Sequence, residues 1–170
     1  TATMGCFANT GQLCISIERI YVDQTIASAF TNRMAARVNA LTLGAQQEYG
    51  PEVGALASKA QLDKMREHID DAVAKGARVV AGGNPRPDLG PFFHEPTVLA
   101  EVTPEMTVHR EETFGPLVSI YPVQSVDEAI ELANDTDYGL NSSVLCGDVK
   151  KGKAIAARLM SGTVNVNDGY

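Results

Sequence analysis

The sequence predicts an α/β protein with a mostly parallel sheet. Segments rich in β-branched and aromatic residues, such as residues 17–22 and 117–123, alternate with segments whose apolar residues recur at helical spacing. Ser58 and Ser125 each precede a Gln or Glu by three residues, a pattern typical of helix starts. Because parallel neighbours need a crossover connection, usually a helix, this alternation favours parallel strands. The 170 residues, 44% of them apolar, suffice for one domain with a substantial core.

The first half of the chain carries two strand patterns and two helix patterns. Apolar residues spaced four, four and three apart, from Phe30 to Leu41, indicate the earlier helix. Ser58 begins the later helix as its N-cap, and Gln61 completes a capping box. The apolar face of this later helix is expected to carry Leu62, Met65, Ile69 and Val73. The expected elements are a strand at 17–22, a helix ending before Gly44, a helix from Ser58 to Gly76 and a strand at 78–81.

The second half continues the same alternation. A loop rich in Pro and Gly, residues 84–91, is expected at the surface and leads into an extended stretch at 96–102. Ser125 and Glu128 form a second capping box directly after a strand pattern. The remaining expected elements are a strand at 117–123, a helix from Ser125 through Ala133, a strand at 141–146, a helix at 149–160 and a strand at 163–167.

Composition and charge exclude several classes of protein. A formal net charge of −7 and a pI near 4.9, without clustered Lys and Arg, argue against a nucleic-acid surface. No apolar run approaches the length of a membrane span, and no secretory signal pattern opens the sequence, so we expect no membrane partner and a cytoplasmic location. Cys6, Cys14 and Cys146 form no C-x-x-C pair, which favours reduced thiols and no metal site.

Cys14 is the first candidate for chemistry. It follows a short polar stretch that contains Gly11 and precedes the first strand pattern. A lone cysteine is most often a small buried hydrophobic residue, and composition alone favours that interpretation. A loop at a sheet edge can, however, expose a thiol and direct backbone amides at the oxygen of an attacked carbonyl. Cys6 and Cys146 lie in apolar runs and are expected to be buried and inert.

The second candidate is the run Arg-Glu-Glu-Thr-Phe-Gly-Pro at 110–116. Two adjacent carboxylates are usually solvated, and Phe114 alone would be assigned to the core. Together, a carboxylate that accepts from sugar hydroxyls and a ring that stacks on a flat face would suit a nucleotide ribose. The histidines lack metal-ligand spacing: His68 on the polar side of its helix, and His94 and His109 in extended or loop stretches, are expected to be surface or structural groups.

Both runs resemble signatures of the aldehyde dehydrogenase family. Residues 7–14 match its pattern of Phe, Asn, Gly, Gln and catalytic Cys, and residues 111–116 match its EE-x-FGP motif, in the family's order. Further family-like segments are Gly82-Gly83 and residues 95–98, 134–140 and 162–167. The resemblance covers the whole chain and is strongest to the succinate-semialdehyde dehydrogenase branch.

The resemblance implies a three-layer, Rossmann-like catalytic domain over residues 1–170, cut from a longer, homo-oligomeric parent whose nucleotide-binding and oligomerisation elements lie elsewhere. It implies that Cys14 attacks an aldehyde, that hydride passes to NAD or NADP, and that water hydrolyses the resulting thioester. Glu112 would hold ribose hydroxyls of the cofactor, Phe114 would contact its nicotinamide end, and the Cys14 amide would help to bind the oxyanion. The expected substrate-pocket residues are Phe7, Leu13 and Ile15.

Some of the family's catalytic groups are missing from this sequence. The general base, in a Glu-Leu-Gly-Gly context, and the oxyanion-binding Asn side chain are expected upstream of Thr1, so residues 1–170 alone should not oxidise aldehydes. The branch commonly places an Arg six residues before the nucleophile to bind the substrate carboxylate, but Ala8 stands there. Either another cation does that work, with Arg19 and Arg110 in range on sequence grounds, or the aldehyde is not succinate semialdehyde.

Three functions are compatible with these residues. The leading one is NAD(P)-dependent oxidation of a small aldehyde, succinate semialdehyde first, through a thiohemiacetal and thioester on Cys14. A non-catalytic interaction domain that shares the fold would instead bury Cys14. An acylating enzyme would form the same thioester but pass the acyl group to coenzyme A or phosphate.

Overall fold

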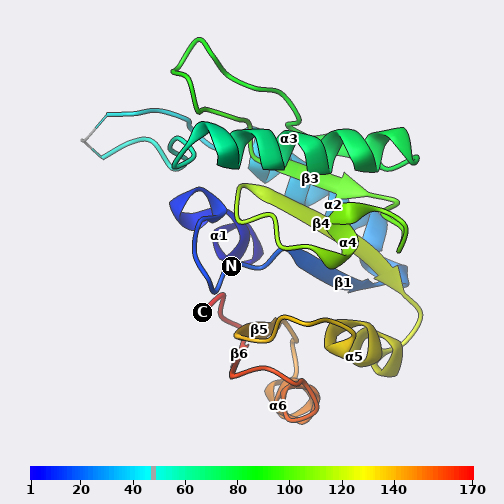
Figure 1. The fold of residues 1–170 in the computed structure, drawn as a ribbon. Helices are drawn as coiled ribbons and strands as arrows, with labels where there is room; N and C mark the ends of the chain where they lie inside the picture. Colours follow the sequence, from blue (N-terminus) through cyan, green and yellow to red (C-terminus); the bar gives the residue numbers. More distant parts are fainter. Residues whose placement is uncertain (47–48) are drawn as a thin grey trace.

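The structure, a computed structural model, describes residues 1–46 and 49–170 and contains two sheets flanked by helices (Figure 1). The strands are β1 (Arg19–Asp23), β2 (Arg78–Ala81), β3 (Thr97–Ala100), β4 (Leu117–Val123), β5 (Asn141–Val144) and β6 (Thr163–Val166). The helices are α1 (Ala2–Phe7), the 3-10 helix η1 (Ala8–Gly11), α2 (Gln24–Asn39), α3 (Lys59–Ala74), α4 (Thr107–Arg110), α5 (Val126–Asn134) and α6 (Val149–Ala156). Within the described residues, no helix is both long and apolar enough to cross a membrane.

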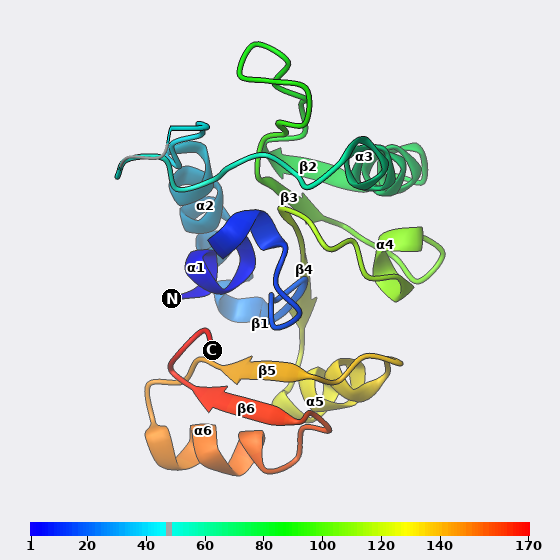
Figure 2. The same cartoon turned by 60° about the vertical axis from the view of Figure 1, so that its left-hand side comes forward.

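The larger sheet has the strand order β1-β4-β3-β2, and the smaller sheet pairs β5 with β6. Strands β1, β4 and β3 are parallel, β2 runs antiparallel at the edge, and β5 and β6 are parallel. Helices α1 and α2 cover one face of the larger sheet, while α3 and α4 cover the other (Figure 2). This three-layer α/β arrangement with a mostly parallel sheet confirms the predicted fold class.

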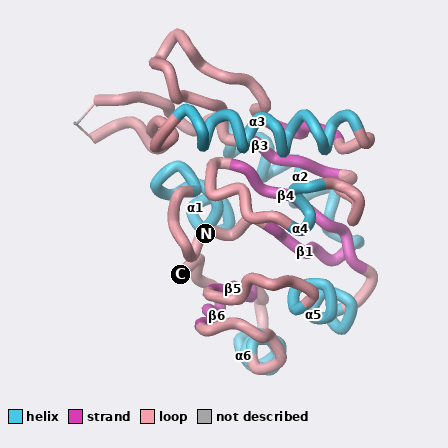
Figure 3. Tube along the Cα trace, in the orientation of Figure 1, coloured by secondary structure: helices cyan, strands magenta, loops and turns pink. Residues whose placement is uncertain are grey.

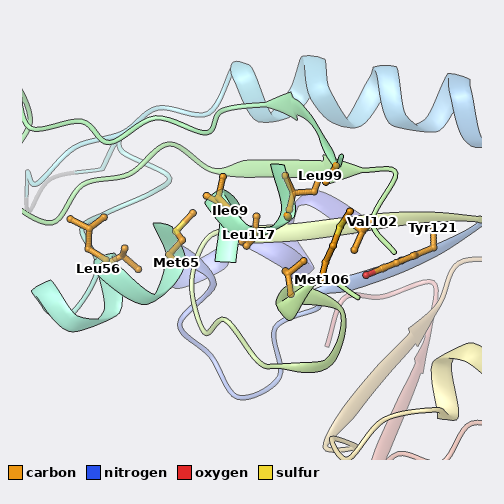
Figure 4. Packing of buried hydrophobic residues seen from close by; sticks show 12 residues of the cluster. Leu56, Met65, Ile69, Leu99, Val102, Met106, Leu117 and Tyr121 are labelled. Atoms are coloured by element: carbon orange, nitrogen blue, oxygen red, sulfur yellow. The ribbon is translucent and has the colours of Figure 1, made fainter. Parts of the chain in front are cut away.

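Side-chain alternation along the central strands divides the core into two clusters. Leu117 and Tyr121 of β4 point to the α3 side, where Met65 and Ile69 pack against them (Figure 4). Their neighbours Val118 and Ile120 point to the opposite side and pack with Phe7 of α1 and with Met34 and Val38 of α2. Because β4 is buried on both faces, its sequence is nearly continuously apolar, as in parallel strands generally.

The predicted strands and long helices are confirmed, with shifts at their ends. Strands β2 and β4 have the predicted bounds, but β1 begins at Arg19 because Ile17 donates its amide to the carbonyl of Gly5 in α1 and not to a strand neighbour. Val73 of α3, expected on the apolar face, is about half exposed. The short helices α1, η1 and α4 were not predicted, since one or two turns carry little periodic signal.

The predicted surface loop after β2 projects beyond the helical layers as a narrow excursion (Figure 3). Its two limbs are tied together by hydrogen bonds from the Arg86 amide to the Phe93 carbonyl and from the Glu95 amide to the Asn84 carbonyl. Phe93 and His94 turn inward and are buried, so the limb that returns to β3 also contributes to the core.

Candidate active site

The loop that presents Cys14 contains three successive residues with left-handed backbone. Asn9, Thr10 and Gly11 have φ values of 50°, 62° and 68°. A side chain makes this conformation costly for Asn9 and Thr10, by about 1 kcal/mol or more each. Such strain persists only where the surroundings impose it. The left-handed turn therefore needs external support.

That support comes from the segment before α3. The Thr10 hydroxyl accepts a hydrogen bond from the Gly54 amide at 2.9 Å. The Gln12 side chain spans the same segment, accepting from the Ala57 amide at 2.8 Å and donating to the Ala55 carbonyl at 3.2 Å. Thr10 is buried, so its hydroxyl bond is shielded from competing water. The side chains of Thr10 and Gln12 therefore attach the loop before Cys14 to residues 54–57.

Cys14 lies in a tight turn immediately after this loop, and its side chain is exposed. The turn is closed by a hydrogen bond from the Ser16 amide to the Leu13 carbonyl at 2.9 Å. Within the part of the chain that the structure describes, the Cys14 amide has no hydrogen-bond partner. A thiol with a free amide directly beside it can place a donor against the oxygen of a carbonyl that the sulfur attacks.

The acidic and aromatic loop at 111–116 is fixed through Thr113. The Thr113 amide donates to the Glu18 carboxylate at 2.7 Å, its hydroxyl lies 2.9 Å from His68 Nδ1, and its carbonyl accepts from Gln61 Nε2 at 2.5 Å. Phe114 has a left-handed backbone, with φ of 56°, and donates its amide to the other Glu18 oxygen at 2.8 Å. Residues from α3 and from the segment directly before β1 therefore determine the shape of this loop.

The two sequence motifs touch where glycines meet. A Cβ placed on Gly11 would lie 2.2 Å from the carbonyl oxygen of Gly115 and 2.5 Å from its carbonyl carbon. No side chain fits in that space, and the left-handed φ of Gly11 also favours glycine. The cysteine loop and the 111–116 loop thus pack backbone against backbone, although about a hundred residues separate them in sequence.

Cys14 and Glu112 border the same cavity, of about 640 Å³, which opens between β1 and β5. Leu13, Glu18 and Arg19 also line it. Phe114 lines a second hollow, of about 450 Å³, next to Asn9 and Gln12 of the cysteine loop. Glu112 and Phe114 therefore line two different hollows.

The three residues expected around the substrate have different environments. Leu13 is half-buried and lines the cavity beside Cys14. Ile15 is half-buried, and Phe7 is only 2% exposed within the α2-side core. Among residues 1–46 and 49–170, neither Phe7 nor Ile15 borders the large cavity.

The other titratable groups have different environments, and His109, expected in an extended or loop stretch, is buried in α4 with no hydrogen-bond partner for Nδ1 among the described residues. The helical pattern put His68 on a polar face, but the 111–116 loop covers that face and buries the ring, and burial lowers the His68 pKa. His94 is buried as well, and its Nδ1 donates to the Glu95 carbonyl at 2.9 Å. Arg110 is bound to the Asp135 carboxylate at 2.8 Å, which lowers the pKa of Asp135. Cys146, expected to be buried, is only partly covered.

Sequence reasoning missed Glu18, Thr113 and Tyr138. Glu18 lies four residues after Cys14 and carries no motif, and Thr113 occupies the variable position of the EE-x-FGP run. Tyr138 reaches the loop from the segment after α5, where its hydroxyl accepts from the Glu112 amide at 3.2 Å. These contacts join residues 26 to 96 positions apart, so no local pattern could reveal them.

Comparisons with known proteins agree with the geometry. The family model described as "Aldehyde dehydrogenase family" matches residues 1–170. The chain is 59% identical over 169 residues to a Mycobacterium bovis protein named "Putative succinate-semialdehyde dehydrogenase NADP(+) 2", covering 99% of this chain and 33% of that protein. It is 43% identical over 166 residues to a 3-sulfolactaldehyde dehydrogenase of Pseudomonas putida, covering 98% and 34%.

Solved structures give the same result for the fold. An NAD+ complex of an aldehyde dehydrogenase from Bacillus cereus matches with a TM-score of 0.92 at 36% identity, over 98% of this chain and 34% of that one. Betaine aldehyde dehydrogenase from Staphylococcus aureus in complex with NAD+ matches with a TM-score of 0.93 at 35% identity, over 98% and 34%. The chain spans about a third of the length of the relatives it matches. The chain belongs to the aldehyde dehydrogenase family.

Proposed function

We propose that the protein of which this chain is a part oxidises a small anionic aldehyde, succinate semialdehyde, to the carboxylic acid with NAD or NADP. The observation that supports this proposal best is the shared cavity. An exposed thiol, Cys14, and the carboxylate of Glu112 border one space of about 640 Å³, and their loops are in contact through Gly11 and Gly115. A nucleophile and a group able to hold a cofactor's ribose are therefore presented together.

In the proposed reaction the Cys14 thiolate attacks the aldehyde carbon and forms a carbon–sulfur bond, while the carbonyl oxygen takes up the negative charge. The unpaired Cys14 amide is placed to donate to that oxygen. A nicotinamide cofactor held by Glu112 and Phe114 would supply the hydride acceptor for the same carbon, which would then remain bound to Cys14 as a thioester. Water then gives up a proton to a base outside residues 1–170 and adds to the thioester carbon, and the carbon–sulfur bond breaks, which releases the carboxylic acid and regenerates the thiolate.

The residues present fit a nicotinamide cofactor. Glu112 is partly exposed at the cavity, so its carboxylate can accept from sugar hydroxyls. Phe114 is partly exposed in the neighbouring hollow, where its ring offers a flat apolar face. The amide of Glu112 is held by Tyr138 and that of Phe114 by Glu18, so the backbone that carries both side chains is already fixed before the cofactor binds.

The substrate class is inferred from the names of two relatives. One is named for succinate semialdehyde and the other for 3-sulfolactaldehyde, and both aldehydes carry an anionic group away from the carbonyl. Both cations considered for that group, Arg19 and Arg110, border the cavity, but Arg110 is already paired with Asp135. We therefore expect an anion on the substrate to be bound by Arg19 or by a cation outside residues 1–170.

Replacement of the thiol tests the reaction. In the full-length protein, Cys14→Ala should reduce aldehyde oxidation by at least about a thousandfold, because Cys6, the other thiol at the cavity, is buried, while the Kd for the cofactor changes little. Within the described residues, Cys146 does not line the cavity. Cys146→Ala is therefore the matched control and should retain activity. Oxidation by Cys14→Ala at the wild-type rate would overturn the proposal.

Substrate and acceptor are tested separately. Succinate semialdehyde should be oxidised with a kcat/KM about a hundredfold above that of butanal, because the uncharged chain leaves the binding cation unpaired. Product analysis by mass spectrometry should show the free acid with or without coenzyme A or phosphate. Formation of an acyl-coenzyme A or acyl phosphate would identify an acylating enzyme instead.

A further inference from the structure

Glu18 joins the strand that follows the nucleophile to the loop that carries Glu112 and Phe114. It lies four residues after Cys14, immediately before β1. One carboxylate oxygen accepts from the Thr113 amide at 2.7 Å and the other from the Phe114 amide at 2.8 Å. Both oxygens are therefore engaged with successive amides of one loop, which fixes the direction of that loop as well as its distance from β1.

The environment of Glu18 makes this contact strong. Burial raises the pKa of Glu18, and the nearby Glu112 carboxylate adds to the rise, while the amides of Thr113 and Phe114 lower it. A carboxylate in such a place is costly unless donors satisfy it, and donors directed at it interact more strongly than they would in water. Within the described residues, the amides of Thr113 and Phe114 are the hydrogen-bond donors to the Glu18 carboxylate.

The loop needs this restraint at one position above all. Phe114 has a left-handed backbone, which an aromatic residue adopts only when its surroundings impose it. Gln61 and His68 restrain the carbonyl and hydroxyl of Thr113. Within residues 1–46 and 49–170, Glu18 is the group that binds the Phe114 amide.

We propose that Glu18 is a positioning residue for cofactor binding, holding the Thr113 and Phe114 amides so that Glu112 and Phe114 are oriented before the cofactor arrives. This inference rests on the proposed function, in which those two side chains contact the nicotinamide cofactor. Because Glu18 and Cys14 belong to one short segment, the same carboxylate also sets the spacing between the nucleophile and the cofactor loop. Glu18 itself need not touch either ligand.

The test replaces Glu18 in the full-length protein with its isostere. Glu18→Gln keeps the shape but turns one acceptor into a donor, which then faces a backbone N–H. The Kd for reduced cofactor, measured by its fluorescence, should rise about tenfold, as the loss of one charge-assisted hydrogen bond predicts. Hydrogen exchange at the amides of Thr113 and Phe114, measured without cofactor, should become faster by a similar factor.

Controls separate positioning from a general loss of structure. Glu131→Gln removes the same charge from an exposed site on α5 and should leave cofactor Kd and amide exchange unchanged. In Glu18→Gln, the rate at which iodoacetamide alkylates Cys14 should stay within about twofold of wild type, because the cysteine loop keeps its own contacts. Glu18→Asp keeps the charge but falls short of the amides, and it should also weaken cofactor binding.

The outcomes distinguish failure of the role of Glu18 from failure of the proposed function. If the wild-type protein binds the cofactor and both Glu18→Gln and Glu18→Asp bind it with the same Kd, the proposed role of Glu18 is wrong. Unchanged exchange at Thr113 and Phe114 would overturn it as well. Failure of the wild-type protein to bind cofactor would instead refute the proposed function, and the exchange measurement would still show whether Glu18 holds the loop.

Discussion

At the scale of single residues, the three cysteines differ in environment. Cys6 is 1% exposed, and burial raises the pKa of its thiol well above the usual range, with the Glu18 carboxylate adding to the rise. Cys146 is partly covered, whereas Cys14 is exposed in its turn. Since the thiolate is the reactive form and must be reached by the reagent, the three thiols should react at very different rates.

Alkylation of the native protein should follow that order. We expect iodoacetamide to modify Cys14 first and Cys6 last, with Cys6 at least about a hundredfold slower because it reacts only through local opening. Peptide mass spectrometry of a time course gives the three rates in one sample. Denatured protein is the control, in which the rates should converge. A native Cys14 slower than Cys6 would contradict both the exposure and the assigned role.

Histidine burial predicts acid sensitivity. Burial lowers the pKa of His68, His94 and His109 below the ordinary value of 6.5. The unfolded chain then binds more protons than the folded one below that pH, so stability is complete above about pH 6.5 and falls as the pH drops through the folded-state pKa values. Urea unfolding of the full-length protein between about pH 5 and 8 should show this decline.

His68→Gln provides the matched comparison. A glutamine can keep a hydrogen bond to the Thr113 hydroxyl without titrating. The variant should lose less stability than wild type over the same acid range, whatever its stability at neutral pH. If both proteins lose stability equally, carboxylates and the other histidines account for the whole effect, and the buried state of His68 does not contribute.

At the scale of elements, two similar capping boxes have different uses. Ser58 and Ser125 both accept from the amide three residues later, as the sequence predicts. Glu128 folds back to the amide of Gln124, one residue before the N-cap, so its contact stays local. Gln61 instead extends to the Thr113 carbonyl, so the start of α3 also supports the 111–116 loop.

This difference predicts that a change at Ser125 affects stability alone, whereas a change at Gln61 also affects cofactor binding. Ser125→Ala should lower the free energy of unfolding by about 1 kcal/mol, the usual value of an N-cap, without affecting cofactor Kd. Gln61→Leu should raise the Kd for cofactor because it leaves the buried Thr113 carbonyl without a donor. Chemical denaturation and cofactor titration of both variants provide the measurements. Equal cofactor affinity in Gln61→Leu and wild type would show that α3 does not restrain the loop.

Contact between the two motif loops depends on one glycine. Gly11→Ala would drive a methyl group into the Gly115 backbone and impose a left-handed φ on alanine. We expect a loss of at least about 2 kcal/mol of stability, together with weaker cofactor binding as the loops separate. Gly147→Ala, where nothing lies within 4 Å, is the control and should be neutral. A neutral Gly11→Ala would contradict the backbone contact.

At the scale of the whole molecule, the two sheets are separated by the cavity that contains Cys14. Its lining comes from β1, α5 and β5, and Asn141 of β5 donates to the carbonyl of Ile15 at 3.1 Å across one end. Residues 1–170 correspond to a third of their relatives. Isolated residues 1–170 should therefore produce no reduced cofactor from aldehyde, whereas the full-length protein should. Turnover by the isolated segment would show that the remaining two thirds supply no essential group.

The long elements of the fold could be predicted from local sequence patterns, whereas the turn before Cys14 could not. The long elements were predictable because each buries one regular face: α3 from Leu62 to Ile69, and β4 on both of its sides. The 3-10 turn before Cys14 was not predictable, because its left-handed residues are sustained by Gly54 and Ala57, which lie more than forty positions away.

The sequence by itself determined the α/β class, the alternation of elements and, through two motifs, the candidates Cys14 and Glu112. These depend on side-chain periodicity and on residue chemistry, which are properties of short segments. Only the tertiary structure decided which groups hold those candidates: Glu18, Thr113 and the glycine contact bring distant backbone atoms together. Such contacts are set by how the layers pack, because hydrogen bonds between remote segments leave no spacing in the sequence.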